Sequence, residues 1–203
     1  THRYPVAGGL KNLKREIALY YKRKYGVELS GEDDVICTIG SKEGISHLCL
    51  ALLGPGDTVL VPSPFFPIHV YAAVIAGASV IRFSLGSEEE FLKQVDSMCR
   101  SLHPRPKLVM LNYPPHPTAT LASSELFVVS VRPATQYNFM VINDFAYGQI
   151  VYDGAVAPSL LEIPGAFEVG VEFSTFSKSY NMAGWRLGYC VGNTRMVGGL
   201  AKI

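Results

Sequence analysis

One lysine has neighbours that suit chemistry better than a surface position. Lys178 lies in a run of small, polar and aromatic residues at 174–181, and Arg186 follows eight positions later. The residues that flank Lys178 are small or apolar and carry no charge. A lysine amine held inside a site can attack a carbonyl carbon or carry a proton. The pattern favours such a role, with an ordinary surface lysine as the alternative.

An acidic residue ends another apolar run. Asp144 follows the apolar residues 139–142, and Tyr147 comes three positions after it. A carboxylate at the end of a buried strand is costly in free energy unless a cationic group pairs with it. The partner is either part of a functional site or an arginine or lysine in a structural ion pair.

Two further segments could bind a ligand that carries a phosphate and a flat ring. Residues 40–44 (Gly-Ser-Lys-Glu-Gly) open a predicted helix, whose first N–H groups suit a phosphate. The alternative, which this pattern alone favours, is Ser41 as an ordinary helix cap with Glu43 in the first turn. In residues 64–69, Phe66 could stack on a ring, or Phe66 could be core and His69 a satisfied helical histidine.

The elements that would position these residues alternate along the chain. Short apolar runs predict strands at residues 35–39, 58–61, 79–83, 108–111, 139–142, 169–173 and 187–191. Helical patterns cover residues 10–25, 41–53, 68–76, 88–100 and 123–132, and Pro133 should break or end the last helix early. This order predicts an α/β fold, with a mostly parallel sheet sandwiched by helices in one domain. Ligands of such sheets bind beyond the carboxyl ends of the strands, where the candidate residues lie.

Composition narrows the class of partner. The 203 residues carry a net charge of +1 and 48% hydrophobic residues, with no basic stretch for nucleic acid and no apolar stretch long enough to span a membrane. We therefore expect a small-molecule partner, a cytoplasmic protein without a signal peptide, and no metal site. The cysteines have no paired spacing and are expected to be reduced and buried; they are Cys37, Cys49, Cys99 and Cys190.

Taken together, these segments resemble the fold-type I aminotransferases, which use pyridoxal 5′-phosphate (PLP). The resemblance rests on Gly-Ser-Lys-Glu-Gly at 40–44, Pro-Ile-His at 67–69, Asp-Phe-Ala-Tyr at 144–147 and, above all, the block at 175–188. The sequence of these motifs is most similar to the bacterial glutamate–pyruvate (alanine) aminotransferases, with the aspartate and diaminopimelate aminotransferases as near relatives. It implies the large PLP-binding domain of the aspartate aminotransferase fold.

The resemblance also implies roles around the cofactor ring. Lys178 would form the Schiff base with PLP and then carry the proton between substrate and cofactor. Asp144 would pair with the pyridine nitrogen, and His69 would stand behind Asp144. Tyr147 would donate to the phenolic oxygen of the ring. Phe66 would stack on the ring, where the family more often has tyrosine or tryptophan.

The remaining implied roles concern the phosphate and the partner subunit. The phosphate ligands would be the backbone amides of Ser41 and Lys42 together with Thr175, Ser177 and Arg186. Tyr4 matches a tyrosine that reaches the phosphate of the neighbouring subunit, which implies a homodimer with a shared active site.

The chain departs from the family in two ways. His116 stands where the family has an asparagine that hydrogen-bonds the phenolic oxygen, and an imidazole cannot both donate and accept in the geometry of an amide. The second departure concerns the N-terminal arm and the C-terminal small domain, which carries the arginine that grips the substrate carboxylate. We expect residues 1–203 to be the large domain without these parts, weak or inactive alone, and the complete gene product to be active.

The implied activity is transamination between an amino acid and a 2-oxo acid, most similar to exchange of alanine and glutamate with pyruvate and 2-oxoglutarate. Alternatives are an aspartate or diaminopimelate aminotransferase, another PLP reaction such as β-elimination, and a truncated, non-catalytic paralogue. A nicotinamide-binding Rossmann protein is excluded, because no G-x-G-x-x-G follows the first strand.

Overall fold

The computed structural model describes residues 6–116 and 118–203 and contains a sheet of seven strands. The strands are β1 (Val35–Thr38), β2 (Thr58–Ser63), β3 (Ser79–Ser84), β4 (Leu108–Asn112), β5 (Met140–Asp144), β6 (Gly170–Thr175) and β7 (Gly188–Gly192). They lie in the order β1-β7-β6-β5-β4-β2-β3. Within the described ranges β7 is antiparallel to both of its neighbours, β1 and β6, and the other neighbouring pairs are parallel. The predicted mostly parallel sheet is confirmed, and each predicted strand ends within two residues of the observed one.

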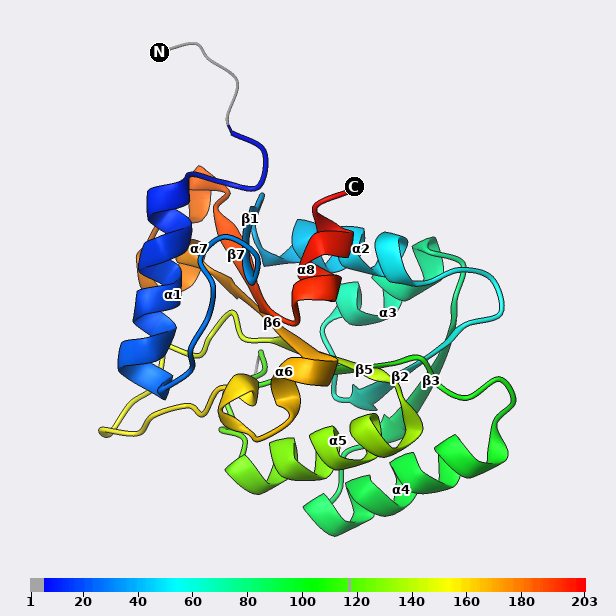
Figure 1. Ribbon diagram of the computed structural model, residues 1–203. Helices are drawn as coiled ribbons and strands as arrows, with labels where there is room; N and C mark the ends of the chain where they lie inside the picture. The colour runs from blue at the N-terminus through cyan, green and yellow to red at the C-terminus, as the bar shows by residue number, and fades with distance from the viewer. Residues whose placement is uncertain (1–5, 117) are drawn as a thin grey trace.

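Helices cover both faces of this sheet. The helices are α1 (Lys11–Tyr25), α2 (Ser41–Leu52), α3 (Pro67–Ile75), α4 (Glu88–Ser101), α5 (Ser124–Tyr137), α6 (Ala166–Val169), α7 (Phe176–Ser179) and α8 (Thr194–Leu200), with 3₁₀ turns η1 (Leu160–Glu162) and η2 (Ala183–Trp185). Figure 1 shows α4 and α5 below the sheet, α2, α3 and α8 above it, and α1 along one side. The sequence did not predict α6, α7, α8 or the two 3₁₀ turns.

The strands are apolar on both faces because each face packs against helices. Along β4, Leu108 and Met110 belong to the core beneath α2, α3 and α8, while Val109 and Leu111 belong to the core against α4 and α5. Successive side chains of a strand point to opposite faces, so a strand covered on both sides is a continuous apolar run. A third cluster joins α1 to β1 and β7.

The expected early end of the helix at Pro133 is wrong. Helix α5 continues through Pro133 to Tyr137 and ends at Asn138, which adopts the left-handed conformation with φ 58°. A proline inside a helix removes one hydrogen bond and strains the preceding turn. Here Pro133 is buried between the buried residues Val131 and Ala134, so packing of the helix outweighs the local cost.

The cysteines agree in part with their prediction. Cys49, Cys99 and Cys190 are buried, whereas Cys37 is only partly buried, and all four are free thiols. No helix in residues 6–116 and 118–203 is both long and apolar enough to cross a membrane.

Candidate functional site

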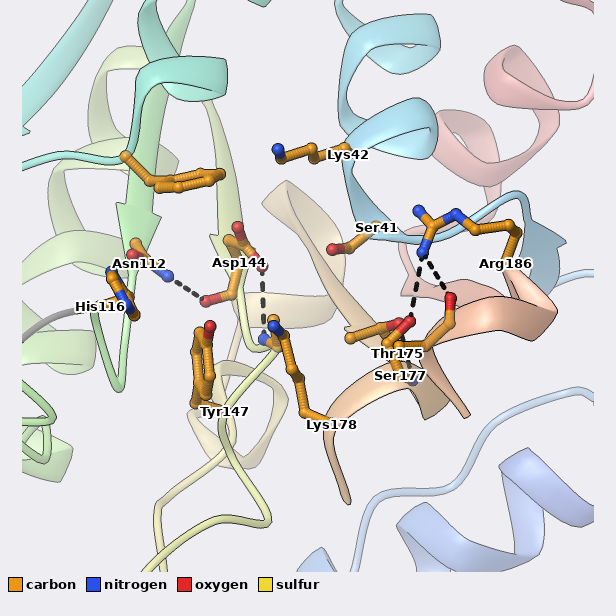
Figure 2. Close-up of a pocket in the computed structure, with 13 residues that line it drawn as sticks. Ser41, Lys42, Asn112, His116, Asp144, Tyr147, Thr175, Ser177, Lys178 and Arg186 are labelled. Carbon is orange, nitrogen blue, oxygen red and sulfur yellow. Dashed lines mark hydrogen bonds between the residues drawn. The ribbon is translucent and has the colours of Figure 1, made fainter. Parts of the chain in front are cut away.

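A cavity of about 240 Å³ opens at the carboxyl edge of the sheet, beyond β4, β5 and β6 (Figure 2). Its walls come from six separate parts of the chain. The residues that line it are Ser41, Lys42, Phe66, Asn112, His116, Asp144, Ala146, Tyr147, Thr175, Ser177, Lys178, Ala183 and Arg186. Residues up to 145 positions apart in the sequence therefore meet at one site. Tyr4 lies outside the described residues.

Asp144 presents a buried carboxylate to this cavity. Its side chain ends β5, only 6% of the residue is exposed, and the backbone N–H of Ala146 donates to Oδ1 at 3.3 Å. Behind it lies His69, which is 1% exposed and whose Nε2 is 3.0 Å from Oδ2. Proline at the first position of α3 fits a helix start and places His69 in the first turn of that helix. His69 thus supports Asp144 and does not line the cavity itself.

No lysine or arginine of the described residues pairs with this carboxylate. Among residues 6–116 and 118–203, no lysine or arginine nitrogen comes within 4.0 Å of Asp144, and its one recorded ion-pair partner is His69. The alternative of a structural ion pair with lysine or arginine is therefore wrong. A buried anion that faces a cavity fits a cationic ligand group such as a protonated pyridine nitrogen.

At the opposite end, hydrogen-bond donors gather at the start of α2. The helix cap is Gly40, with φ 80°, and not Ser41, which lies in the first turn and is buried. The interpretation of Ser41 as the cap is therefore wrong. The first N–H groups of a helix have no partner within it and attract anions. Glu43 instead turns back to accept a hydrogen bond from the backbone N–H of Ile39 at 2.9 Å.

Arg186 brings a guanidinium group to the same end. Its Nη1 donates to the carbonyl of Ala183 at 3.1 Å and lies 3.4 Å from the hydroxyl of Ser177. A Cβ atom added to Gly40 would lie 2.5 Å from Nη2 of Arg186, and one added to Gly188 would lie 2.8 Å from the backbone of Gly40. Both glycines are therefore needed for β7 and Arg186 to approach the start of α2.

The hydroxyl of Thr175 makes two hydrogen bonds within the chain. It accepts a hydrogen bond from the backbone N–H of Ser177 at 3.1 Å and donates to the carbonyl of Leu187 at 3.2 Å. Thr175 lines the cavity, but its one hydrogen is already used. In this arrangement it caps α7 and so positions the next residues, which include Lys178.

Lys178 lies on α7 at the centre of the site. Its Nζ is 5.2 Å from the centroid of the Tyr147 ring, and the His116 ring stacks on Tyr147 at 6.0 Å between centroids. On another wall, Nζ of Lys42 lies 4.8 Å from the centroid of Phe66. The cavity therefore combines an amine, a phenol, an imidazole, an aromatic face and a carboxylate.

Asn112 is a lining residue that the sequence analysis missed. It ends β4, and its Nδ2 donates to the backbone carbonyl of Asp144 at 2.8 Å (Figure 2). The available signal was its place at the carboxyl end of a strand, which is the rule that singled out Asp144.

The donor set fits a ligand that has an anion at one end and a cationic ring nitrogen at the other. Arg186, Ser177 and the start of α2 supply donors for an anion, and Asp144 supplies the matching carboxylate. PLP has this distribution of charge, and a lysine within the same cavity suits its aldehyde.

Comparison with known proteins gives a consistent result. The sequence profile of the family described as aminotransferase class I and II matches residues 1–203. The chain is 48% identical to the glutamate-pyruvate aminotransferase AlaC of Escherichia coli over 203 residues, which cover all of this chain and 49% of that protein. It is 41% identical to the LL-diaminopimelate aminotransferase of Syntrophobacter fumaroxidans, again over the whole chain and 52% of that protein.

Solved structures are similar along almost the whole chain. Substrate-bound BacF from Bacillus subtilis superposes with a TM-score of 0.90 at 35% identity, covering 99% of this chain and 51% of BacF. The chain spans about half the length of the curated relatives it matches. Because the profile covers every residue and the fold agrees with it, the chain belongs to the class I and II aminotransferases, a family of PLP-dependent transferases.

Proposed function

We propose that the protein containing this chain transfers an amino group between an amino acid and a 2-oxo acid, with PLP held in the cavity. The observation that carries this proposal is the buried carboxylate of Asp144, which lines the same cavity as the amine of Lys178 and has no lysine or arginine partner among the described residues. Family membership supports the reaction class.

The phosphate end of the cavity would hold the cofactor. Arg186 supplies a fixed, permanently charged fork, the Ser177 hydroxyl lies 3.4 Å from it, and the amides of Ser41 and Lys42 begin α2. Thr175 would contribute through the turn that it caps. This division separates anchoring at one end from chemistry at the other.

The residues at the ring end would control protons and charge. When bound, PLP acts as an electron sink for the substrate α-carbon. Asp144 would keep the ring nitrogen protonated, with His69 holding the carboxylate in place. Phe66 would stack on the ring, and Tyr147 would donate to its phenolic oxygen. The Nζ atom of Lys178 would bond to the cofactor in the resting enzyme and take the α-proton from the substrate during turnover.

For the substrates, we propose alanine and glutamate with their 2-oxo acids. The similarity to the E. coli glutamate-pyruvate aminotransferase, at 48% identity, supports this choice. Several LL-diaminopimelate aminotransferases at about 40% identity make diaminopimelate the second candidate. Assays that pair each donor with 2-oxoglutarate distinguish the two.

We further propose that residues 1–203 form the large cofactor-binding domain of a homodimer, with Tyr4 reaching the phosphate of the neighbouring subunit. The support is that the chain matches about half the length of its relatives and that every described lining residue lies at or near the sheet edge. Size-exclusion chromatography with light scattering on the full protein tests the dimer. A monomer that turns over substrate at the same rate as the dimer would contradict the shared site.

The central test is covalent labelling. After incubation of the full protein with PLP, borohydride reduction should fix the cofactor onto a peptide that contains Lys178. Lys178→Ala should abolish the label and the transaminase activity, whereas Lys202→Ala, outside the cavity, should retain both. A label on Lys42 instead, or full activity in Lys178→Ala, would overturn the proposal.

A further inference from the structure

The turn after β4 places an imidazole on the cavity wall. The ring of His116 stacks on Tyr147 with 29° between the ring planes, and Lys178 approaches the same phenol ring. Figure 2 shows the Tyr147 ring between His116 and Lys178. The imidazole, the phenol and the amine therefore form a row along one side of the cavity.

His116 differs from His69 in having free hydrogen-bonding capacity. His69 is buried, and both of its nitrogens are engaged, Nδ1 by the backbone N–H of Phe66 and Nε2 by Asp144. His116 is exposed to the cavity and, within the described ranges, makes no recorded hydrogen bond or ion pair. Its ring nitrogens are thus available to a ligand.

Five charged or titratable groups line the cavity together with His116. They are Lys42 from α2, Asp144 and Tyr147 at the end of β5, Lys178 from α7, and Arg186 beyond η2. Asp144 is already bound by His69, and Arg186 is engaged by Ser177 and Ala183. The ring of Tyr147 stacks on His116, and the amine of Lys178 lies over the same Tyr147 ring.

We propose, on the basis of the proposed function, that His116 donates a hydrogen bond to the phenolic oxygen of the cofactor and adds an ionisation to the site that an asparagine cannot supply. A neutral imidazole donates one hydrogen bond and an imidazolium two. The amide of an asparagine does not titrate, whereas the imidazole of a histidine ordinarily takes up a proton at about pH 6.5. Protonated His116 places a positive charge beside the ring oxygen and disfavours a second positive charge at the nitrogen of Lys178.

The visible absorption of bound PLP tests this inference in the full protein. The absorption of the wild type, plotted against pH, should show a component near the histidine range that His116→Asn removes. His103→Asn is the matched control, because His103 is also exposed and followed by proline but lies outside the cavity. It should keep the wild-type curve. Identical curves for the wild type and His116→Asn, with PLP bound to Lys178 in both, would overturn the inference and leave the proposed function intact.

A direct measurement does not depend on a variant that folds. NMR titration of the histidine Hε1 signals in the wild type should show that PLP binding moves the titration of His116 and leaves that of His103 unchanged. An unchanged His116 titration in the PLP-bound protein would overturn the inference. Failure of the wild type to bind PLP at all would instead overturn the proposed function, and this inference with it.

Discussion

At the scale of single residues, the site depends on which nitrogen of His69 carries a proton. The backbone N–H of Phe66 points to Nδ1 at 3.3 Å, so Nδ1 accepts and bears no proton. The proton of the neutral ring therefore sits on Nε2 and is donated to Asp144 at 3.0 Å. His69 orients the carboxylate by a hydrogen bond and leaves its negative charge available for a ligand.

Substitution of His69 tests this arrangement. His69→Leu should lower the free energy of unfolding by about 1–3 kcal/mol, because the backbone N–H of Phe66 and the buried carboxylate of Asp144 both lose a partner. Urea denaturation measures the change. His103→Leu, at an exposed position, should change it by no more than about 0.5 kcal/mol. Equal stability of the two variants would show that the two His69 bonds make no net contribution.

Arg186 provides a second test at this scale. Arg186→Lys keeps the charge but loses the planar fork, so one Nζ cannot reproduce the guanidinium contacts to Ser177 and Ala183 and still meet a phosphate. We expect the dissociation constant of PLP to rise about 10- to 100-fold, because a charge-assisted hydrogen bond is lost. Fluorescence titration with PLP measures the affinity, and Arg132→Lys on α5 is the control. Unchanged affinity in Arg186→Lys would mean that the phosphate lies elsewhere.

These residues also show how far sequence reasoning reaches. Asp144 and Lys178 could be singled out because polar residues after the strands of a parallel sheet meet at one edge. Asn112 obeys the same rule, but its significance depends on the register that pairs it with Asp144, which no local pattern reveals. The second hydrogen bond of Thr175 depends on Leu187, which the fold brings back beside β6.

At the scale of secondary-structure elements, a buried carboxylate joins the sheet to its surroundings. Glu172 of β6 is 0% exposed. Its Oε1 accepts from the hydroxyls of Tyr21 at 2.8 Å and Ser159 at 2.9 Å, and its Oε2 from Nδ2 of Asn143 at 3.0 Å and the backbone N–H of Leu160 at 2.9 Å. One side chain thus ties α1, β5 and η1 to β6, beside the strand that ends in Asp144.

Burial raises the pKa of Glu172 above its ordinary value of 4.5, although hydrogen bonds, first of all that from Asn143, act in the opposite direction. The two groups at Oε2 are obligate donors, so an added proton would sit on Oε1, where the hydroxyl of Tyr21 or Ser159 can accept. A raised pKa in the folded state means that folding favours the protonated form. The contribution of Glu172 to stability is therefore greatest at low pH and decreases as the pH rises through the raised pKa.

Two substitutions separate hydrogen bonding from charge at Glu172. Glu172→Gln should gain stability relative to the wild type as the pH rises from about 4.5, because only the wild type ionises. Glu172→Leu should lose about 1–3 kcal/mol for each buried partner left unsatisfied, and should be the less stable variant throughout. Urea denaturation from pH 4 to 8 measures both. A stability difference between wild type and Glu172→Gln that does not change with pH would contradict the raised pKa.

Elements with an apolar pattern along their whole length were predicted correctly. The short helices, and the continuation of α5 through the buried Pro133, were not. The seven strands and the first four helices were recognisable because their apolar periodicity runs over their whole length. Helices α6 and α7 have four residues each, too few for a helical pattern to emerge. Pro133 misled the prediction because the packing that retains it involves residues distant in sequence.

At the scale of the whole molecule, the sheet separates two apolar cores that share its strands. Cys49 of α2 belongs to the core above the sheet, and Cys99 of α4 to the core below it. Neighbouring residues of β4, such as Leu108 and Val109, serve opposite cores. Neither core can lose its packing without disturbing the strands on which the other depends, so we expect the two faces to unfold together.

The reactivity of the buried thiols tests whether the two faces of the sheet unfold together. Burial raises the pKa of Cys49 to about 12 and that of Cys99 to about 11, and the thiolate is the reactive form, so both should resist a thiol reagent at pH 8 in the folded protein. Cys37, which is partly buried, should react first.

In pulse labelling across a urea gradient, Cys49 and Cys99 should become reactive at the same midpoint, read by mass spectrometry of their peptides. A lower midpoint for Cys99 would show that the layer of α4 and α5 detaches before the sheet unfolds. Because the cavity is built on the carboxyl edge of the same strands, a common midpoint would also mean that PLP, by binding the folded form, delays exposure of both thiols equally.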